Sequence, residues 1–309
     1  MDEHQRRISS FDRTDRVPWF QPDLAAEEFI ARLNGNLLPL EAQLADETYG
    51  SRYASVLIVS VPRSGSTYLY QKLAANPRIG YVSNLMARFY EAPLVGAHLQ
   101  NMLLPNHIQE FGTFKSTHGV TPHIWEPHEF GYFFSRFLNF SGDNHEDFEE
   151  DIFVKGLRDL DVALARISLV LQRPVVYKGA IAPFVLNELL SETEVKILHL
   201  SRQEPEVVNS ILRVRKDRLG SEHSWWSIRP NDWRQLSYLS PFDQVTAQYR
   251  KVNDAIETAK KAHSDRFFTV SYEELLRNEA ETLRAVYRWV LSPLAQQARE
   301  DSAGESKAD

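Results

Sequence analysis

Four short apolar runs, each followed by a segment with helical character, form the main pattern of this chain. The runs cover residues 55–59 (SVLIV), 174–177 (PVVY), 195–200 (VKILHL) and 267–271 (FFTVS). Short apolar strands that alternate with longer helices are typical of a parallel sheet covered by helices on both faces. We therefore predict an α/β protein with three layers, α/β/α, and a central, mainly parallel sheet.

Amphipathic periodicity predicts the helices around these strands. We expect helices over 23–33, 37–46, 68–75, 205–216 and 272–291 and near 183–190. The stretches 80–150 and 218–240 are rich in aromatic residues and lack strand alternation, and such insertions commonly form the walls of a substrate pocket. We expect one domain over residues 1–292 and a disordered tail over 293–309.

Composition narrows the class of protein. The chain has 309 residues, 43% of them hydrophobic and 25% charged, which is typical of a globular protein. Its net charge of −7 disfavours a general nucleic-acid binder but allows a local basic pocket. The chain has no cysteine, which excludes disulfides, thiolate metal sites and cysteine nucleophiles.

The N-terminal segment and the apolar runs bear on location. Residues 1–16 are charged and have no apolar centre, so we expect no signal peptide. No run of about 18 apolar residues occurs, so we expect no membrane span. These observations predict a cytoplasmic protein, and they leave open whether it is a monomer or a homodimer.

The segment between Ser60 and Thr67 (SVPRSGST) is the most informative stretch of the sequence. A strand, a tight loop of small residues and a helix direct loop N–H groups and the positive end of the helix at one point, where they stabilise an anion. Compared with the nucleotide-binding loop G-x-x-x-x-G-K-[ST], Ser66 replaces the lysine and Arg63 supplies a cation inside the loop. A purely structural alternative is a turn with Thr67 or Ser66 as the N-cap.

A second segment, residues 199–216, carries a further candidate anion site. Arg202 follows a predicted strand, Pro205 lies near the start of the next helix, and Ser210 comes eight residues after Arg202. The forked donors of an arginine and one serine hydroxyl suit a phosphate group. The alternative is an arginine at the sheet edge and a serine that faces solvent.

Together the two segments resemble the sulfotransferases that use 3′-phosphoadenosine 5′-phosphosulfate (PAPS). The 5′-phosphosulfate loop of that family is matched by Pro62–Thr67, and its 3′-phosphate motif by Arg202 and Ser210. Arg63 resembles the carbohydrate, tyrosyl-protein and bacterial branches, because the cytosolic small-molecule branch has lysine there. Residues 270–278 (VSYEELLRN) look like the family segment that shapes the adenine side.

This resemblance implies a P-loop-like sulfotransferase fold and sulfonate transfer from PAPS, without a metal, to a hydroxyl or amine of a carbohydrate, lipid or small metabolite. Sulfonate transfer follows the logic of phosphoryl transfer, in which the protein positions the groups and stabilises charge. The residues that the resemblance places at the cofactor are Arg63, Ser64, Gly65, Ser66, Thr67, Arg202, Ser210 and Tyr272. Arg213 or Arg215 can add to the 3′-phosphate pocket.

The resemblance also gives Arg63 a catalytic role, because its charge would stabilise the leaving oxygen of the 5′-phosphate. The other catalytic residues are less clearly marked. Lys178 ends a predicted strand, as a lysine of the cytosolic branch does, and its charge suits the transferring sulfonate. The histidine that serves as base in that branch is absent, and Ala180 stands in its position. The best candidates for the general base are Glu126, His128 and Glu129, of which we favour His128 and then Glu129. Glu91 and His118 are weaker candidates.

Other interpretations of these residues stay open. His118, His123 and His128 are spaced by five residues, which suits neither a helix nor a strand, so we expect no metal site. The tryptophans at 225, 226 and 233 can either stack on an acceptor or anchor a long loop. A P-loop kinase-like protein and a non-catalytic nucleotide-binding relative remain the alternative functions.

Overall fold

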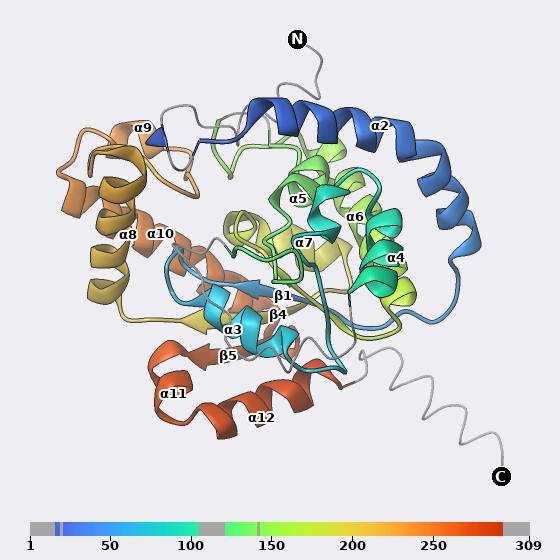
Figure 1. The fold of residues 1–309 in the computed structure, drawn as a ribbon. Coiled ribbons are helices and arrows are strands. Elements are labelled where there is room, and N and C mark those ends of the chain that lie inside the picture. Colours follow the sequence, from blue (N-terminus) through green and yellow to red (C-terminus); the bar gives the residue numbers. More distant parts are fainter. Residues whose placement is uncertain (1–15, 19–20, 105–120, 141–142, 293–309) are drawn as a thin grey trace.

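The computed structural model describes residues 16–18, 21–104, 121–140 and 143–292. In these ranges a sheet of five parallel strands, ordered β2-β3-β1-β4-β5, forms the centre of the molecule (Figure 1). The strands are β1 (Ser55–Val59), β2 (Gly80–Tyr81), β3 (Val175–Lys178), β4 (Lys196–Ser201) and β5 (Phe267–Ser271). The prediction of an α/β protein with a parallel sheet is confirmed.

Strand β2 is the one strand of the described sheet that sequence analysis missed. It has only two residues, and it pairs with β3 through Gly80↔Val175 and Tyr81↔Val176. Two residues give neither an apolar run nor an alternation. The backbone approach at Gly80 is close, because a Cβ there would lie 3.1 Å from side-chain atoms of both Arg173 and Val175.

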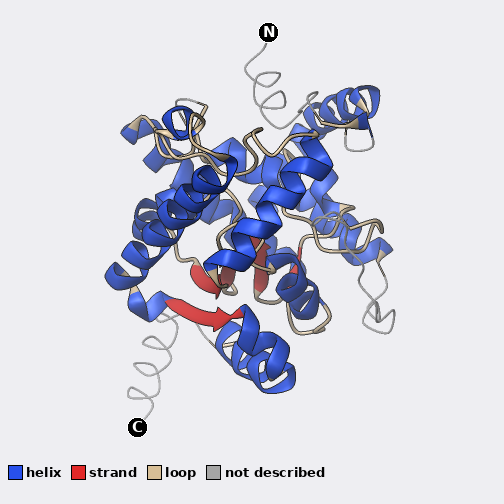
Figure 2. Cartoon of the chain, turned by 90° about the vertical axis from the view of Figure 1, so that its left-hand side faces the viewer, coloured by secondary structure: helices blue, strands red, loops and turns tan. Residues whose placement is uncertain are grey.

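The two faces of the sheet belong to separate cores. Leu57 and Val59 enter one core, and Val56 and Ile58 enter the other. The first face is covered by α5 (Gly131–Phe137), α6 (Glu150–Leu171), α7 (Leu186–Glu192), α8 (Glu204–Leu219) and α10 (Pro241–Ala262). The second is covered by α3 (Ser66–Ala74), α11 (Tyr272–Arg277) and α12 (Glu279–Val290). Figure 2 shows the strands enclosed between these helices, so the three-layer prediction is confirmed.

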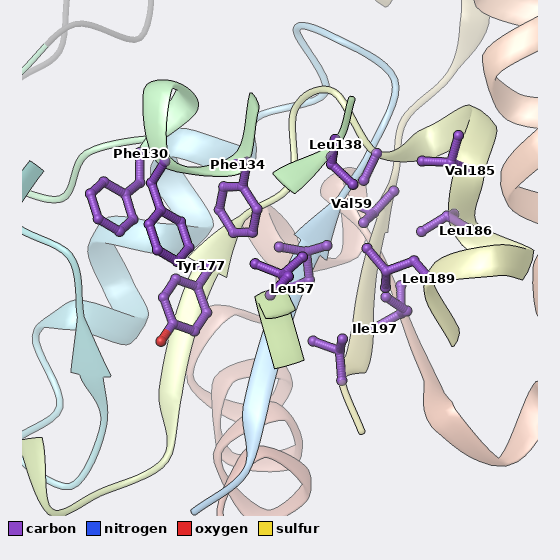
Figure 3. Close-up of a cluster of buried hydrophobic side chains, with 14 of the residues drawn as sticks. Leu57, Val59, Phe130, Phe134, Leu138, Tyr177, Val185, Leu186, Leu189 and Ile197 are labelled. Atoms are coloured by element: carbon purple, nitrogen blue, oxygen red, sulfur yellow. The ribbon is translucent and has the colours of Figure 1, made fainter. Parts of the chain in front are cut away.

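The aromatic residues before and in α5 fasten this helix to the sheet. Figure 3 shows Phe130 and Phe134 beside Tyr177 of β3, with Leu57 of β1 next to them. The rings of Phe134 and Tyr177 meet edge to face with centroids 6.0 Å apart. Because Tyr177 is the penultimate residue of β3, this packing brings the segment just before α5 to the carboxyl end of the sheet.

The predicted pair of helices over 23–33 and 37–46 is wrong, because one helix, α2 (Leu24–Glu47), runs through both and through Pro39. Gly35 and Asn36, which separate the two predicted helices, lie inside α2. The adjacent Asn34 is buried and stabilises the continuous helix, because its amide nitrogen donates to the carbonyl oxygens of Ile30 and Arg88. Tertiary contacts here override local propensity.

The remaining elements are short. They are α4 (Pro93–Leu103), α9 (Trp233–Leu236), and the 3₁₀ turns η2 (Met86–Arg88), η4 (Pro183–Val185) and η5 (Ser264–Arg266). The predicted helix over 272–291 is divided at Asn278 into α11 and α12. The tail expected over 293–309 lies outside the described residues.

Candidate functional site

The candidate site lies at the carboxyl ends of the strands, where ligands of parallel α/β sheets usually bind. Strand β1 stands between β3 and β4, and the loop 60–65 follows it directly. Lys178 ends β3, Arg202 follows β4, and Tyr272 follows β5. Polar residues from four strands therefore meet at one edge of the sheet.

The loop after β1 has the backbone of an anion cradle. Arg63 and Gly65 both have positive φ, 71° and 96°. Gly65 is the N-cap of α3, and it has no side chain to accept the first N–H groups of the helix. The structural alternative, in which Thr67 or Ser66 is the N-cap, is therefore wrong. The N-terminal turn of α3 keeps donors of the kind that bind a phosphate.

Arg63, Arg202 and Ser210 form one cluster beside this loop. The Nε atom of Arg63 donates to the hydroxyl of Ser210 at 3.2 Å. Nη1 of Arg202 donates to the carbonyl oxygen of Arg63 at 3.1 Å. Burial and the neighbouring charge of Arg202 lower the pKa of Arg63, against the opposing effect of Glu129. Two arginines held this close suit a ligand with concentrated negative charge.

Two polar atoms of this region lack a hydrogen-bond partner within the part of the chain that the structure describes. They are the buried hydroxyl of Ser64 and the Nε atom of Arg202. Buried polar groups are normally paired, and an unpaired group in a cleft commonly marks a place for a ligand or water. The loop and the arginine cluster therefore fit a phosphate-bearing ligand.

A second cluster joins Thr67, Lys178 and Glu129. Nζ of Lys178 donates to the hydroxyl of Thr67 at 3.1 Å and also to Oε1 of Glu129. The Lys178 side chain is 11% exposed, whereas that of Glu129 is 46% exposed and so is accessible from outside. Partial desolvation raises the pKa of Glu129, but the charge and the hydrogen bond of Lys178 outweigh it and hold that pKa below its usual range.

The other base candidates are engaged in local structure. Nδ1 of His128 accepts the backbone N–H of Phe130 at 2.9 Å, and burial lowers the pKa of His128 to about 4. Glu126 is buried and accepts the backbone N–H of His123 at 2.7 Å. Glu91 lies beyond η2, where its backbone N–H donates to Asn34. His118 lies outside the described residues.

Arg213 and Arg215 of α8, the two alternatives for an additional arginine in the 3′-phosphate pocket, have different surroundings. Arg215 is fully buried and donates to Gln244 and Gln248 of α10. The alternative that Arg215 joins the 3′-phosphate pocket is therefore wrong. Arg213 is exposed, and its charge contributes to lowering the pKa of Arg63 after burial and Arg202.

Arg218 is a residue of this site that sequence analysis missed. It is 9% exposed, and its guanidinium is close enough to Glu129 and Arg63 for both charges to influence its pKa, which burial lowers. The predicted helix ended at residue 216, whereas α8 continues to Leu219. Eight residues turn a helix about 80° past two full turns, so the spacing from Ser210 did not mark Arg218 as a residue of the same face.

Two of the three tryptophans at 225, 226 and 233 anchor the loop that contains them. Trp225 is buried, and its indole N–H donates to the carbonyl oxygen of Ile228 at 3.2 Å. Trp233 packs against Trp225 at 5.9 Å between ring centroids and lies under the guanidinium of Arg229.

Within the described ranges, no group of three or more histidine, aspartate or glutamate side chains is arranged to hold a metal ion.

Comparison with known proteins agrees with this description. No protein-family model and no curated protein matches the sequence. The fold is that of a sulfotransferase: it resembles the crystal structure of sulfotransferase STF9 from Mycobacterium avium over 96% of this chain and 80% of that chain, with a TM-score of 0.60 and 13% identity. Sulfotransferase STF1 from Mycobacterium tuberculosis H37Rv matches over 88% and 74%, with a TM-score of 0.49 and 15% identity. The similarity to STF9 confirms the predicted sulfotransferase fold.

Proposed function

We propose that this chain is a sulfotransferase that moves a sulfonate from PAPS to a hydroxyl or amine of a carbohydrate, lipid or small metabolite. The observation that carries the proposal is the cluster of Arg63, Arg202 and Ser210 beside the anion loop. A single phosphate cradle is common to many nucleotide enzymes. A second, separate phosphate subsite suits a nucleotide that carries a 3′-phosphate.

The two subsites would hold the two ends of the cofactor. The loop N–H groups, with the hydroxyls of Ser66 and Thr67, would hold the 5′-phosphosulfate end. Arg202 and Ser210 would hold the 3′-phosphate, and Arg63 belongs to the loop and also donates to Ser210. The unpaired atoms of Ser64 and Arg202 support this fit. When bound, the cofactor supplies an activated sulfonate with a phosphate as its leaving group.

The cluster of Thr67, Lys178 and Glu129 serves the transfer step. Lys178 would neutralise charge on the transferring sulfonate. Glu129 would take the proton of the acceptor hydroxyl or amine. Glu129 suits this role because it is ionised, accessible and held by Lys178.

His128 is the less suitable base, which reverses the order favoured by the sequence. Because Nδ1 accepts a backbone N–H, a neutral His128 carries its proton on Nε2, and that atom donates. Neither nitrogen of His128 is therefore available to take a proton from the acceptor. We therefore assign the base to Glu129 and a structural role to His128, whose Nδ1 accepts the backbone N–H of Phe130 next to α5.

The alternative functions have less support. A kinase-like protein needs the loop lysine that grips the β- and γ-phosphates, and Ser66 stands at that position. A relative that only binds the nucleotide does not need the pair of Lys178 and the accessible Glu129, whereas a sulfotransferase uses both. Among the helices in the described ranges, none is both long and apolar enough to cross a bilayer. A cytoplasmic location, the absence of a nucleic-acid partner and a monomeric or homodimeric state stay predictions.

Transfer of radiolabelled sulfonate from PAPS to a panel of acceptors (a phenol, a disaccharide, a primary amine and a lipid alcohol) tests the proposal. We expect transfer by the wild type, at least about a 100-fold loss in Glu129→Gln, and less than about a 10-fold loss in His128→Gln. Equal rates in wild type and Glu129→Gln would remove Glu129 from the mechanism. Cofactor binding without transfer to any acceptor would favour the non-catalytic relative.

A further inference from the structure

The side chain of Tyr272 lies between the two anion-binding motifs. A Cβ atom placed on Gly65 would be 2.3 Å from Cε2 and 2.5 Å from Cδ2 of Tyr272, so the ring rests against the loop after β1. The guanidinium carbon of Arg202 lies 4.6 Å from the centroid of the same ring. One side chain therefore touches the 5′-phosphosulfate loop and the 3′-phosphate arginine at once.

The sheet places Tyr272 there. Strands β4 and β5 pair in register at Ser201↔Ser271, so Arg202 and Tyr272 are the first residues after neighbouring strand ends. The hydroxyl of Ser271 accepts the backbone N–H of Glu274 at 3.1 Å and caps α11. The carboxylate of Glu273 accepts the backbone N–H of Gln203 at 3.1 Å, which joins the two connections once more.

Arg202 needs such support. An arginine side chain has many rotamers, and fixing it on a ligand costs conformational entropy. Nη1 is held by the carbonyl oxygen of Arg63, but Nε lacks a hydrogen-bond partner in the described part of the chain, and Glu206 lies at 3.5 Å from Nη2 in an exposed pair. The Tyr272 ring supplies a further constraint through packing and cation–π attraction.

We propose that Tyr272 is a positioning residue for recognition of the 3′-phosphate. Its ring acts as a spacer that fixes Arg202 at a set separation from the Gly65 loop, and thereby matches the site to a nucleotide with phosphates at both the 3′ and 5′ positions. This inference rests on the proposed function. It differs from a contact between Tyr272 and the adenine base, which would act on all adenine nucleotides alike.

Binding of adenosine 3′,5′-bisphosphate and of adenosine 5′-phosphate by calorimetry separates these roles. We expect Tyr272→Leu to weaken the bisphosphate about 10-fold and the monophosphate less than about 3-fold, since only the former uses Arg202. Tyr272→Phe keeps the ring and should leave both affinities within about twofold of wild type. Equal weakening of both nucleotides by Tyr272→Leu would overturn the proposal in favour of a base contact.

A double-mutant cycle tests the coupling directly. In an Arg202→Ala background, Tyr272→Leu should cause no further loss of bisphosphate affinity, because the residue it positions is gone. Additive losses, about 100-fold for two independent 10-fold effects, would contradict the spacer role. If Tyr272→Leu fails to fold, as judged by its thermal midpoint, Tyr272→Met takes its place in the same cycle.

The outcome also separates this inference from the proposed function. If the wild type binds the bisphosphate no more tightly than the monophosphate, the result contradicts both the proposed function and this inference. If the wild type prefers the bisphosphate and Tyr272→Leu keeps the same preference, the result contradicts the spacer role alone.

Discussion

Arg63 adopts a left-handed backbone conformation that costs a residue with a side chain about 1–2 kcal/mol. Its carbonyl oxygen accepts Arg202 and its Nε donates to Ser210, so both ends of the residue are fixed by the site. Strain of this kind persists where a function depends on it. At the residue scale, the loop therefore sacrifices stability to place a guanidinium beside its anion cradle.

The strained backbone at residue 63 predicts that glycine and alanine substitutions differ in stability, although both weaken binding. Arg63→Gly should be about 1 kcal/mol more stable than Arg63→Ala, because glycine adopts positive φ without the Cβ penalty. Both variants should lose at least about tenfold in affinity for adenosine 3′,5′-bisphosphate. Urea unfolding and calorimetry measure the two quantities. Equal stability of the glycine and alanine variants would show that the backbone here is not strained.

The Lys178–Glu129 pair makes a prediction about protonation. Lys178→Met removes the cation that holds the pKa of Glu129 down, so that pKa should rise. Carbon NMR of the glutamate carboxyls, assigned with Glu129→Gln, follows the titration. A Glu129 that titrates at the same pH with and without Lys178 would contradict the pairing and weaken the case for Lys178 in the transfer step.

At the scale of single elements, α8 carries both structure and site on different faces. Arg215 joins α8 to α10 through Gln244 and Gln248, and it also lies 5.3 Å from the ring centroid of Trp225. Ser210 faces the loop after β1 instead. The sequence of this helix therefore mixes arginines of two kinds, which its charge pattern alone does not distinguish.

A matched pair of variants separates them. Arg215→Ala should destabilise the fold by about 2–4 kcal/mol, because it removes a buried side chain and leaves two glutamine oxygens short of donors. Arg213→Ala should change stability by less than about 0.5 kcal/mol, because the residue is exposed, and should weaken binding of the bisphosphate. Denaturant unfolding and calorimetry provide the readouts. Loss of stability in Arg213→Ala instead would reverse the assignment.

The elements show which features the sequence could predict. The apolar runs of β1, β3, β4 and β5 were predicted within about one residue, since strands buried on both faces are visibly apolar. The two-residue β2 was not, because its pairing depends on β3 rather than on its own residues. The continuous α2 was missed for a similar reason, since buried Asn34 stabilises it through Arg88.

The site shows the same division. The loop after β1 and the spacing of Arg202 and Ser210 are local signals, so the sequence alone was enough to predict an anion site here, and the structure brings these residues together. The choice of Glu129 over His128 needed the position of Lys178, which is about 50 residues away in the sequence and contacts Glu129 only because α5 packs on β3. Arg218 was missed because the predicted end of α8 fell short of it.

At the scale of the whole molecule, three buried or half-buried histidines predict a weakness in acid. Burial lowers the pKa of His128, His145 and His199 to about 4 each. Between pH 4 and about 6.5 the unfolded chain therefore binds protons that the folded chain does not, and the free energy of unfolding falls as the pH decreases. Each histidine contributes at most about 1.4 kcal/mol per pH unit.

Urea unfolding at pH 7.0 and pH 5.0 checks this expectation. The free energy of unfolding should be lower at pH 5.0, and His199→Gln should flatten the difference. Glu41 acts in the opposite direction, because burial raises its pKa, so the single-histidine variant is the sharper comparison. Equal or greater stability of the wild type at pH 5.0, with no change of slope in His199→Gln, would contradict the assignment of neutral buried histidines.

We propose that the carboxyl edge of the sheet recognises a nucleotide with phosphates at its 3′ and 5′ positions. Calorimetric titration of the purified protein with adenosine 3′,5′-bisphosphate, and separately with ATP plus magnesium, tests it most directly. We expect tight binding of the bisphosphate without metal, and binding that is about tenfold weaker but still measurable in Arg202→Ala. Binding of ATP with magnesium but not of the bisphosphate would contradict the account and favour a kinase-like function.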